Sequence, residues 1–346
     1  MFVEAEAGLY DSMHLVPLRI FGYHLAVLTN DGLLARTLSR HFAAFRERVP
    51  GPHALRIYLL DAEGRGRRYP LTLLDSSHES ATRTKSVWDW RSLLEEIDLQ
   101  REVEACWTGR EYYFTGRLAS VPRRAINAVI LALVGAMSRD GYVPLRASAV
   151  IGPTGAVAIV SESLDVEARA LSLLLRRGCR LATNYWLFVR PAAQGIQMAG
   201  VMANAWSAGA STGASLFSVL LSRLGRRPVR ASPHLDGGRS LLGIGSIGPL
   251  KEIQVLRERP GAVGWHTKML DQVESLQILK DAASPFGELL AAVTDPDDLD
   301  ACLGLVSSSI PVYEVGGQIP MDWLTRTVIR SLSDAGEDLR KEAYVA

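Results

Sequence analysis

The sequence predicts an α/β protein of two domains, with an α+β N-terminal domain over residues 1–120 and a second domain over residues 121–346. Two observations predict this class. A length of 346 residues is enough for two domains that each bury a core. In the second domain the apolar run Val157–Val160 precedes polar residues 161–167, and Ala168–Arg177 then carries leucines at helical spacing. A strand that leads through a loop into a helix N-terminus is the layout of a phosphate-binding P-loop.

The first 120 residues contain short apolar runs and amphipathic stretches but no motif that identifies a function. The helices are predicted from apolar residues on one face, as at Leu33, Leu34 and Leu38. The predicted strands are Leu18–Leu28, Leu55–Leu60 and Tyr112–Arg117, and the predicted helices are Gly32–Arg46 and Ser92–Val103.

The second domain begins with a long predicted helix, Pro122–Arg139, whose proline suits the first helical turn. Gly178 stands where the residue after a helix C-terminus is expected, which ends the central helix. From Pro249 onward a strand, a helix around Leu270–Lys280 and a terminal strand–helix pair complete the domain.

Composition excludes several classes of function. The formal net charge of +1 gives no global electrostatic reason to bind nucleic acid or a membrane surface. The longest apolar helix candidate, Ala125–Met137, is too short to span a bilayer. The three cysteines, Cys106, Cys179 and Cys302, form no CxxC pair, so a reducing cytoplasm is the expected location.

Candidate chemistry is sparse outside the central stretch. The seven histidines form no metal-ligand spacing, and we expect no metal site and no cofactor. His234, in SPHLDGG, is followed by an acidic residue and a glycine pair, and a structural turn is the favoured interpretation. The glycine-rich residues 243–248 run directly into Pro249 and a strand, so they do not match a dinucleotide-binding loop.

The central loop carries three carboxylates, Glu162, Asp165 and Glu167. Buried close together they would have raised pKa values and could transfer protons near neutral pH. The alternative is that Ser163 or Asp165 caps the helix while Glu167 interacts favourably with its dipole.

Several segments resemble HPr kinase, and more closely the HPr-kinase-like proteins of bacterial peptide-modification gene clusters. Pro144–Val150 (PLRASAV) is similar to the family's "PLHASAV", and Arg177–Leu181 matches its "RGxxL". Pro249–Glu258 resembles "PLxxIYVLxR", and Ile310–Leu324 resembles "VPVYxLxxPxDxxxL". The resemblance covers roughly residues 142–332 in segments, and implies an HPr-kinase-like P-loop domain.

The residues that would grip nucleotide in that family are replaced. The three glycines of its loop fall on Ser161, Leu164 and Val166, the lysine on Glu167, and the magnesium-binding hydroxyl on Ala168. A P-loop requires backbone conformations that glycine tolerates and β-branched residues do not, so Val166 would be strained there by about 1–3 kcal/mol.

The remaining family positions have changed as well. The family's histidine is Arg146 here, and its acidic pair is Asn184 and Tyr185, while Ser163 is the signature residue kept in the loop. The resemblance therefore implies a degenerate member that does not carry out ATP-dependent phosphotransfer. A further reading is a kinase that uses displaced residues. Phosphoryl transfer depends strongly on the missing residues, which argues against this reading.

Two classes of function follow from this reading. In the first, the protein is a peptide- or partner-binding accessory protein in natural-product (peptide) maturation. In the second, the former nucleotide site carries out ATP-independent isomerisation, cyclisation or hydrolysis. The expected partners are a peptide or small-molecule ligand and a biosynthetic protein. The expected binding residues are Arg146, Ser148, Ser161, Ser163, Asn184 and Trp186, and the expected catalytic residues are Glu162, Asp165, Glu167, Tyr185 and His234.

Overall fold

A computed structural model describes residues 13–61, 103–108, 111–184, 186–201, 246–259, 261–286, 290 and 295–333. The chain divides into two compact units, Met1–Ala136 and Met137–Ala346. The expected division after residue 120 precedes helix α4, most of which belongs to the first unit. Both units contain helices and strands, so the predicted α/β class is confirmed.

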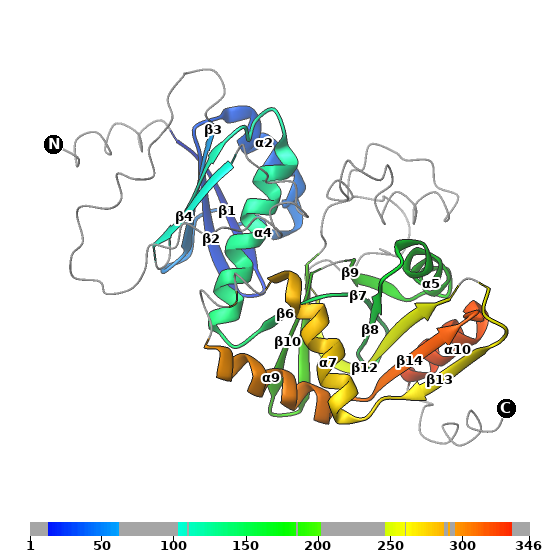
Figure 1. Cartoon of the computed structure of the whole chain (residues 1–346). Coiled ribbons are helices and arrows are strands. Elements are labelled where there is room, and N and C mark those ends of the chain that lie inside the picture. Colours follow the sequence, from blue (N-terminus) through cyan, green and yellow to red (C-terminus); the bar gives the residue numbers. More distant parts are fainter. Residues whose placement is uncertain are drawn as a thin grey trace. The chain divides into compact units, whose positions relative to one another are not determined.

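The first unit contains a five-stranded sheet in the order β1-β2-β3-β5-β4 (Figure 1). The strand pairs β1–β2 and β4–β5 are antiparallel, and the pairs β2–β3 and β3–β5 are parallel. Its elements are β1 (His14–Ile20), β2 (Tyr23–Thr29), α2 (Gly32–His41), a short 3₁₀ turn (Ala43–Phe45), β3 (Leu55–Asp61), β4 (Val103–Thr108), β5 (Glu111–Gly116) and α4 (Pro122–Arg139).

One expected strand of the first unit is in fact a hairpin. The run Leu18–Leu28 is broken by Phe21 and Gly22, whose φ angles are 52° and 87°. Two consecutive residues with positive φ form the tight turn that matches the twist of antiparallel strands. Of the expected helix Ser92–Val103, residues 92–102 lie outside the described residues and Val103 begins β4.

The second unit contains a nine-stranded sheet in which β6, β10, β11, β12, β8, β7 and β9 follow one another, and β14 joins β12 to β13. Its elements are β6 (Val143–Arg146), β7 (Ser148–Ile151), β8 (Ala156–Ser161), α5 (Leu164–Arg176), β9 (Arg180–Thr183), β10 (Trp186–Ala192), β11 (Gly195–Val201), β12 (Ser246–Glu258), β13 (Trp265–Met269), α7 (Gln272–Ala283), a 3₁₀ turn (Ser284–Phe286), α9 (Pro296–Ser309), β14 (Val312–Gly317) and α10 (Met321–Ser331).

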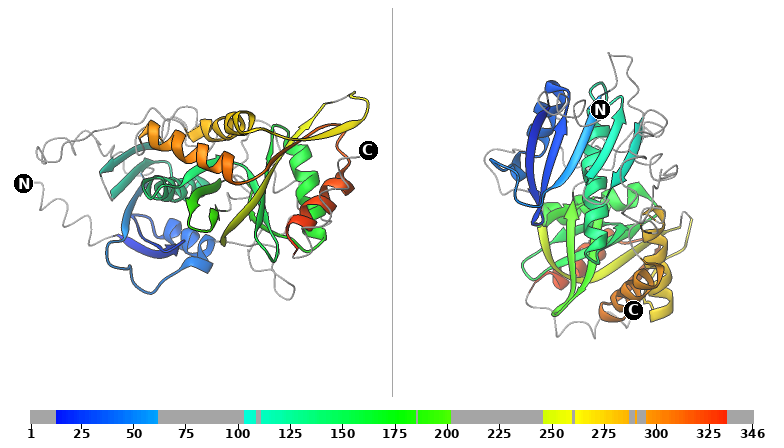
Figure 2. Two further views of the ribbon diagram at one scale, coloured as in Figure 1. Left: turned by 90° about the horizontal axis from the view of Figure 1, so that it is seen from below. Right: turned by 90° about the vertical axis from the view of Figure 1, so that its left-hand side faces the viewer.

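Strand β12 connects the two parts of this sheet. Its first residues pair antiparallel with β11, and its later residues pair parallel with both β8 and β14. Helices α5 and α10 lie side by side, and α7 and α9 form a second adjacent pair (Figures 1 and 2). The core beneath α5 and α10 is apolar, with Val157, Ile159, Leu171 and Leu324 each fully buried.

The central stretch follows the sequence prediction with one difference. The strand at Val157–Val160 is confirmed within β8, and Gly178 follows α5 with the positive φ expected there, 95°. The helix, however, begins at Leu164 rather than Ala168, because Ser163 caps it. The polar segment between strand and helix is therefore shorter than the sequence predicted.

Candidate functional site

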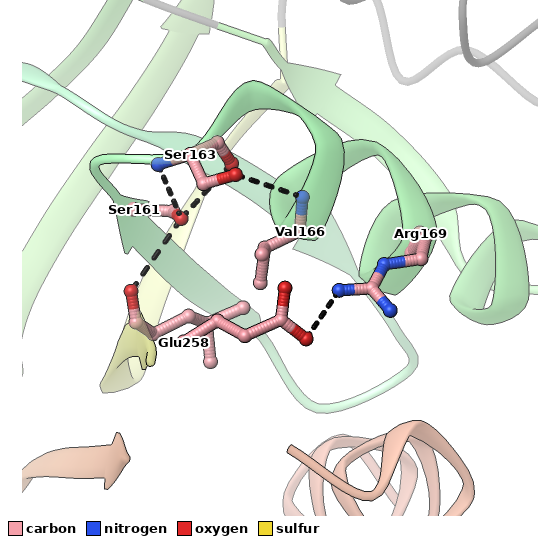
Figure 3. Close-up of polar contacts among 6 residues, drawn as sticks. Ser161, Ser163, Val166, Arg169 and Glu258 are labelled. Carbon is pink, nitrogen blue, oxygen red and sulfur yellow. Dashed lines mark hydrogen bonds and ion pairs between the residues drawn. The ribbon is translucent and has the colours of Figure 1, made fainter. Parts of the chain in front are cut away.

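The connection between β8 and α5 consists of two residues, Glu162 and Ser163. The Ser163 hydroxyl accepts a hydrogen bond from the Val166 N–H at 3.5 Å, and the Ser163 N–H donates to Ser161 Oγ at 3.2 Å (Figure 3). Ser161 Oγ in turn lies 3.1 Å from the Ser163 carbonyl oxygen and 3.5 Å from that of Leu256. The connection is thus held by the hydroxyl of Ser163 and by that of Ser161, the last residue of β8.

This geometry differs from a phosphate-binding loop. In such a loop several consecutive N–H groups turn inward around an anion, which needs residues in left-handed conformations. In the described part of the chain the non-glycine residues with positive φ are Phe21 and His53, both in the first unit. Val166 belongs to helix α5, so the strain that a P-loop conformation would impose on it does not arise.

Glu167 lies in the first turn of α5 and its side chain is buried, with 7% of its surface exposed. Its carboxylate accepts a hydrogen bond from the hydroxyl of Ser148, which is fully buried at the start of β7. Burial raises the pKa of Glu167 to about 7, although the Ser148 hydrogen bond and the charge of Arg146 both act to lower that pKa. The first turn therefore holds a carboxyl group that titrates near neutral pH.

Arg146 ends β6 and Ser148 begins β7, so the two residues lie on either side of one junction. Arg146 pairs with Trp186 between β6 and β10, and Ala149 pairs with Thr183 between β7 and β9. The register of β7 with β9 shifts between Ala149 and Val150. Asn184 directly follows β9.

These residues differ in their surroundings. Arg146 is exposed, whereas Asn184 is 8% exposed and its Oδ1 has no hydrogen-bond partner within the described residues. Trp186 is 1% exposed, and its ring lies 5.1 Å from that of Phe286 at a 41° tilt, so Trp186 packs in the interior. Ser148 is hydrogen bonded to Glu167, and the charge of Arg146 acts on Glu167. We call these three residues the Glu167 cluster.

The other expected site residues lie elsewhere or outside the described residues. Glu162 and Asp165 are exposed, and Ser161 and Ser163 bond to each other as described above. The alternative in which Ser163 caps α5, with Asp165 and Glu167 in its first turn, matches the helix as it stands. Tyr185 and His234 lie outside the described residues.

Two features were missed by reasoning from the sequence. Arg169 of α5 forms an ion pair with Glu258 at the end of β12, at 2.5 Å (Figure 3). The two residues are 89 positions apart in the sequence, so no local pattern indicates the pair. The second feature is Glu252, buried within β12, which accepts hydrogen bonds from Ser331 Oγ at 2.7 Å and Gln254 Nε2 at 2.9 Å.

Among the described residues, no group of three or more His, Cys, Asp or Glu side chains could hold a metal ion. No helix in the described ranges has the length and apolar character needed to cross a membrane.

The comparisons with known proteins give matches among solved structures alone. No family model and no curated protein sequence matches the chain. Among solved structures, the chain is similar to the Hpr(Ser) kinase/phosphatase from Coxiella burnetii, with a TM-score of 0.28 and 11% sequence identity. The similarity covers 54% of this chain and 93% of the other chain.

Proposed function

We propose that this chain is a degenerate HPr-kinase-like protein that does not carry out ATP-dependent phosphotransfer. It acts as a peptide- or partner-binding accessory protein in natural-product (peptide) maturation. The observation that carries the first part is the two-residue connection between β8 and α5, which the hydroxyls of Ser161 and Ser163 hold by hydrogen bonds. The biosynthetic setting comes from the family resemblance of the sequence segments.

Two features near this connection oppose nucleotide binding, a hydrogen bond that is already made and a carboxylate. The Val166 N–H, which could face a phosphate, already donates to Ser163 Oγ. A carboxylate, Glu167, occupies the position at which the family's lysine would neutralise phosphate charge. Phosphoryl transfer depends on such positioning and charge stabilisation, so losing both removes most of the rate enhancement.

The test is a nucleotide titration of the full chain by isothermal calorimetry and thermal denaturation. We expect neither Mg·ATP nor Mg·ADP to bind or to raise the melting temperature. The double variant Glu167→Lys with Ala168→Ser restores two family residues, yet it also fails to bind, because the connection still lacks a phosphate-sized turn. Micromolar binding of Mg·ATP by the natural chain would overturn the proposal.

A second candidate function is favoured by one observation, the buried Glu167 carboxyl with its pKa raised to about 7. A group with this pKa can both accept and donate a proton at neutral pH, as an ATP-independent isomerase, cyclase or hydrolase requires. The Ser148 hydroxyl, hydrogen bonded to it, would orient the carboxyl group.

Separate Glu167→Gln and Arg146→Gln variants distinguish the two functions. An acid/base role predicts that Glu167→Gln loses product formation by 10²-fold or more while partner binding persists, on the order of a general acid–base contribution. A binding role predicts that Arg146→Gln weakens partner binding. If neither substitution changes turnover, the catalytic candidate is excluded.

A further inference from the structure

Strand β13 lies at an edge of the sheet in the second unit, because β14 is its pairing partner within the described residues (Figure 1). Its register with β14 is continuous from Trp265 to Met269, without a bulge. Helix α7, which follows β13, packs against β6 in the other part of the sheet. An open and regular strand edge is a template for pairing with another strand.

The hydrogen bonds to β14 determine which backbone groups this edge presents. The Leu270 N–H donates to the Val312 carbonyl oxygen at 2.9 Å. The Gln318 N–H donates to the Gly264 carbonyl oxygen at the same distance. Hydrogen-bonded positions alternate along an antiparallel pair. The even-numbered residues of β13 therefore face β14, and the odd-numbered residues present their N–H and C=O groups to the open side.

The odd-numbered side chains of β13 form an apolar surface beside these backbone groups. Trp265 is 41% exposed and Met269 is 54% exposed, with Thr267 between them. The Trp265 ring lies 4.6 Å from that of Trp323 in α10. Alternate side chains of a strand share a face, so all three lie on the face that α10 contacts. Large apolar side chains exposed next to open backbone groups indicate an interface.

The charged residues on the opposite face of β13 do not oppose self-association. Lys268 forms an ion pair with Glu274, and His266 Nε2 lies 3.6 Å from a carboxylate oxygen of Glu314. A lysine on an edge strand usually prevents pairing through its charge. Here an acidic side chain of the same chain accompanies each basic one. A second copy of β13 therefore meets a balanced distribution of charge rather than a cationic one.

We propose that the chain forms a homodimer in which β13 pairs antiparallel with β13 of a second copy, related by a two-fold axis beside Thr267. This register sets Trp265 of each copy opposite Met269 of the other, and Thr267 opposite its own equivalent. All three become hydrogen-bonded positions, so every backbone group on the open side finds a partner. Contact between a thioether and an indole is favourable. The strand is complementary to itself, which identifies a second copy as the occupant.

Analytical ultracentrifugation of the full chain over a range of concentrations tests the dimer. The weight-average mass should rise from that of one chain toward that of two, with a Kd of about 1–100 µM, because a single strand pair gives an interface at the small and weak end of the known range. Below these concentrations the edge is open. Hydrogen exchange of residues 265–269 should therefore slow as the concentration rises.

Two variants test the pairing itself. Thr267→Pro removes the central N–H of the open side, and an edge strand tolerates proline where the N–H does not bond to the neighbouring strand. Met269→Glu places a charge against the partner's Trp265. Each variant should raise the Kd roughly tenfold or more. Thr267→Val is the control that keeps the N–H, and Leu305→Glu places the same charge on a side chain of α9 that is 53% exposed. Both controls should dimerise like the natural chain.

Circular dichroism verifies that each variant is folded, and Met269→Glu decides alone should Thr267→Pro not fold. A single-chain mass up to about 1 mM, ten times the upper end of the expected Kd, would overturn the inference. So would a dimer that forms equally well in both variants, or one that Leu305→Glu weakens as much as Met269→Glu, because the contact would then lie elsewhere. The inference goes beyond the proposed function and does not depend on it, since nucleotide titration tests the latter.

Discussion

At the scale of single residues, Glu167 is the least expected side chain in the second unit. Its burial disfavours the charged form, and this effect outweighs both the Ser148 hydrogen bond and the attraction of Arg146. Burial of the Glu167 carboxyl group therefore makes the free energy of unfolding depend on pH, which a stability measurement can test.

The folded chain should hold the proton of Glu167 more tightly than the unfolded chain. The pKa is about 7 in the folded chain and has an ordinary value of 4.5, so the carboxyl group destabilises the fold progressively as pH rises from about 4.5 through 7. Glu167→Gln mimics the protonated form and should stabilise the chain at pH 8 relative to pH 5, by an amount on the order of 3 kcal/mol. Chemical denaturation of both proteins at the two pH values measures the difference.

Glu162→Gln is the control for this measurement, because Glu162 is exposed in the neighbouring connection. Its effect on the free energy of unfolding should stay within about 0.5 kcal/mol at both pH values. A stability difference for Glu167→Gln that is the same at pH 5 and pH 8 would show that the Glu167 carboxyl is not buried as described.

At the scale of elements, the start of α5 determines what this part of the chain can bind. Ser163 caps α5, so the helix begins at Leu164, four residues before the expected start at Ala168, and the connection is shorter. The helix then carries Asp165 and Glu167 in its first turn, where negative side chains are favourable to the helix dipole. The same acidic turn repels phosphate.

Removing the Ser163 cap should destabilise the chain by the amount typical of helix N-caps. Ser163→Ala should lower the free energy of unfolding by about 1 kcal/mol, whereas Ser163→Asp should retain most of it. Ser308→Ala is the control, because Ser308 is an exposed serine within α9 whose hydroxyl bonds to a carbonyl of its own helix. Urea denaturation provides the comparison, and equal losses for the two alanine variants would contradict a capping role.

A second element-scale feature is the antiparallel pairing of β6 with β10 and of β7 with β9. The first pairing sets Arg146 beside the buried Trp186, and the second sets Ala149 beside Thr183. A slip by one residue in the first pairing would expose Trp186, and a slip in the second would move Ser148 away from Glu167. The buried indole and the Glu167 cluster therefore depend on two separate pairings.

At the scale of the whole molecule, the strands of the second unit should differ in how readily they open. Strand β8 is paired on both sides by β7 and β12, while β13 is paired by β14 alone within the described ranges. Amides of a doubly paired, buried strand exchange mainly through global unfolding, and those of an exposed edge exchange through local opening. Residues 156–161 should thus exchange much more slowly than residues 265–269.

Hydrogen exchange followed by mass spectrometry tests this order, with peptides that cover the two segments separately. The exchange of residues 156–161 should slow in step with any increase in global stability, such as that expected for Glu167→Gln at pH 8. Protection of residues 265–269 equal to that of residues 156–161 would mean that β13 is covered by a further partner.

Much of the second unit could be predicted from its sequence, because local patterns dominate there. The apolar run at Val157–Val160 and the glycine after α5 both act through neighbouring residues, and both predictions are confirmed. The start of α5 was predicted too late, because leucine periodicity begins at Ala168 whereas a single serine hydroxyl decides where the helix begins. The strand Leu18–Leu28 was wrong for a similar reason, since two positive φ angles outweigh a continuous apolar run.

The candidate site was only partly predictable, because it depends on pairing between distant segments. The family resemblance placed Arg146, Tyr185 and Trp186 near the loop that carries Glu167. The contact between Ser148 and Glu167, however, requires the orientation of α5 over β7. The ion pair between Arg169 and Glu258 joins residues 89 positions apart, and no local periodicity reports on such a pair.

The hydroxyls of Ser161 and Ser163 have a thermodynamic consequence for the chain in the cell. A protein whose helix end is completed by a bound anion gains stability by mass action as the ligand concentration rises. Here the hydroxyls of Ser161 and Ser163 take that place, and because they belong to the same chain their effective concentration is fixed. The Ser163 hydrogen bond at the start of α5 should therefore form whatever the anion concentration, because both of its partners belong to the chain.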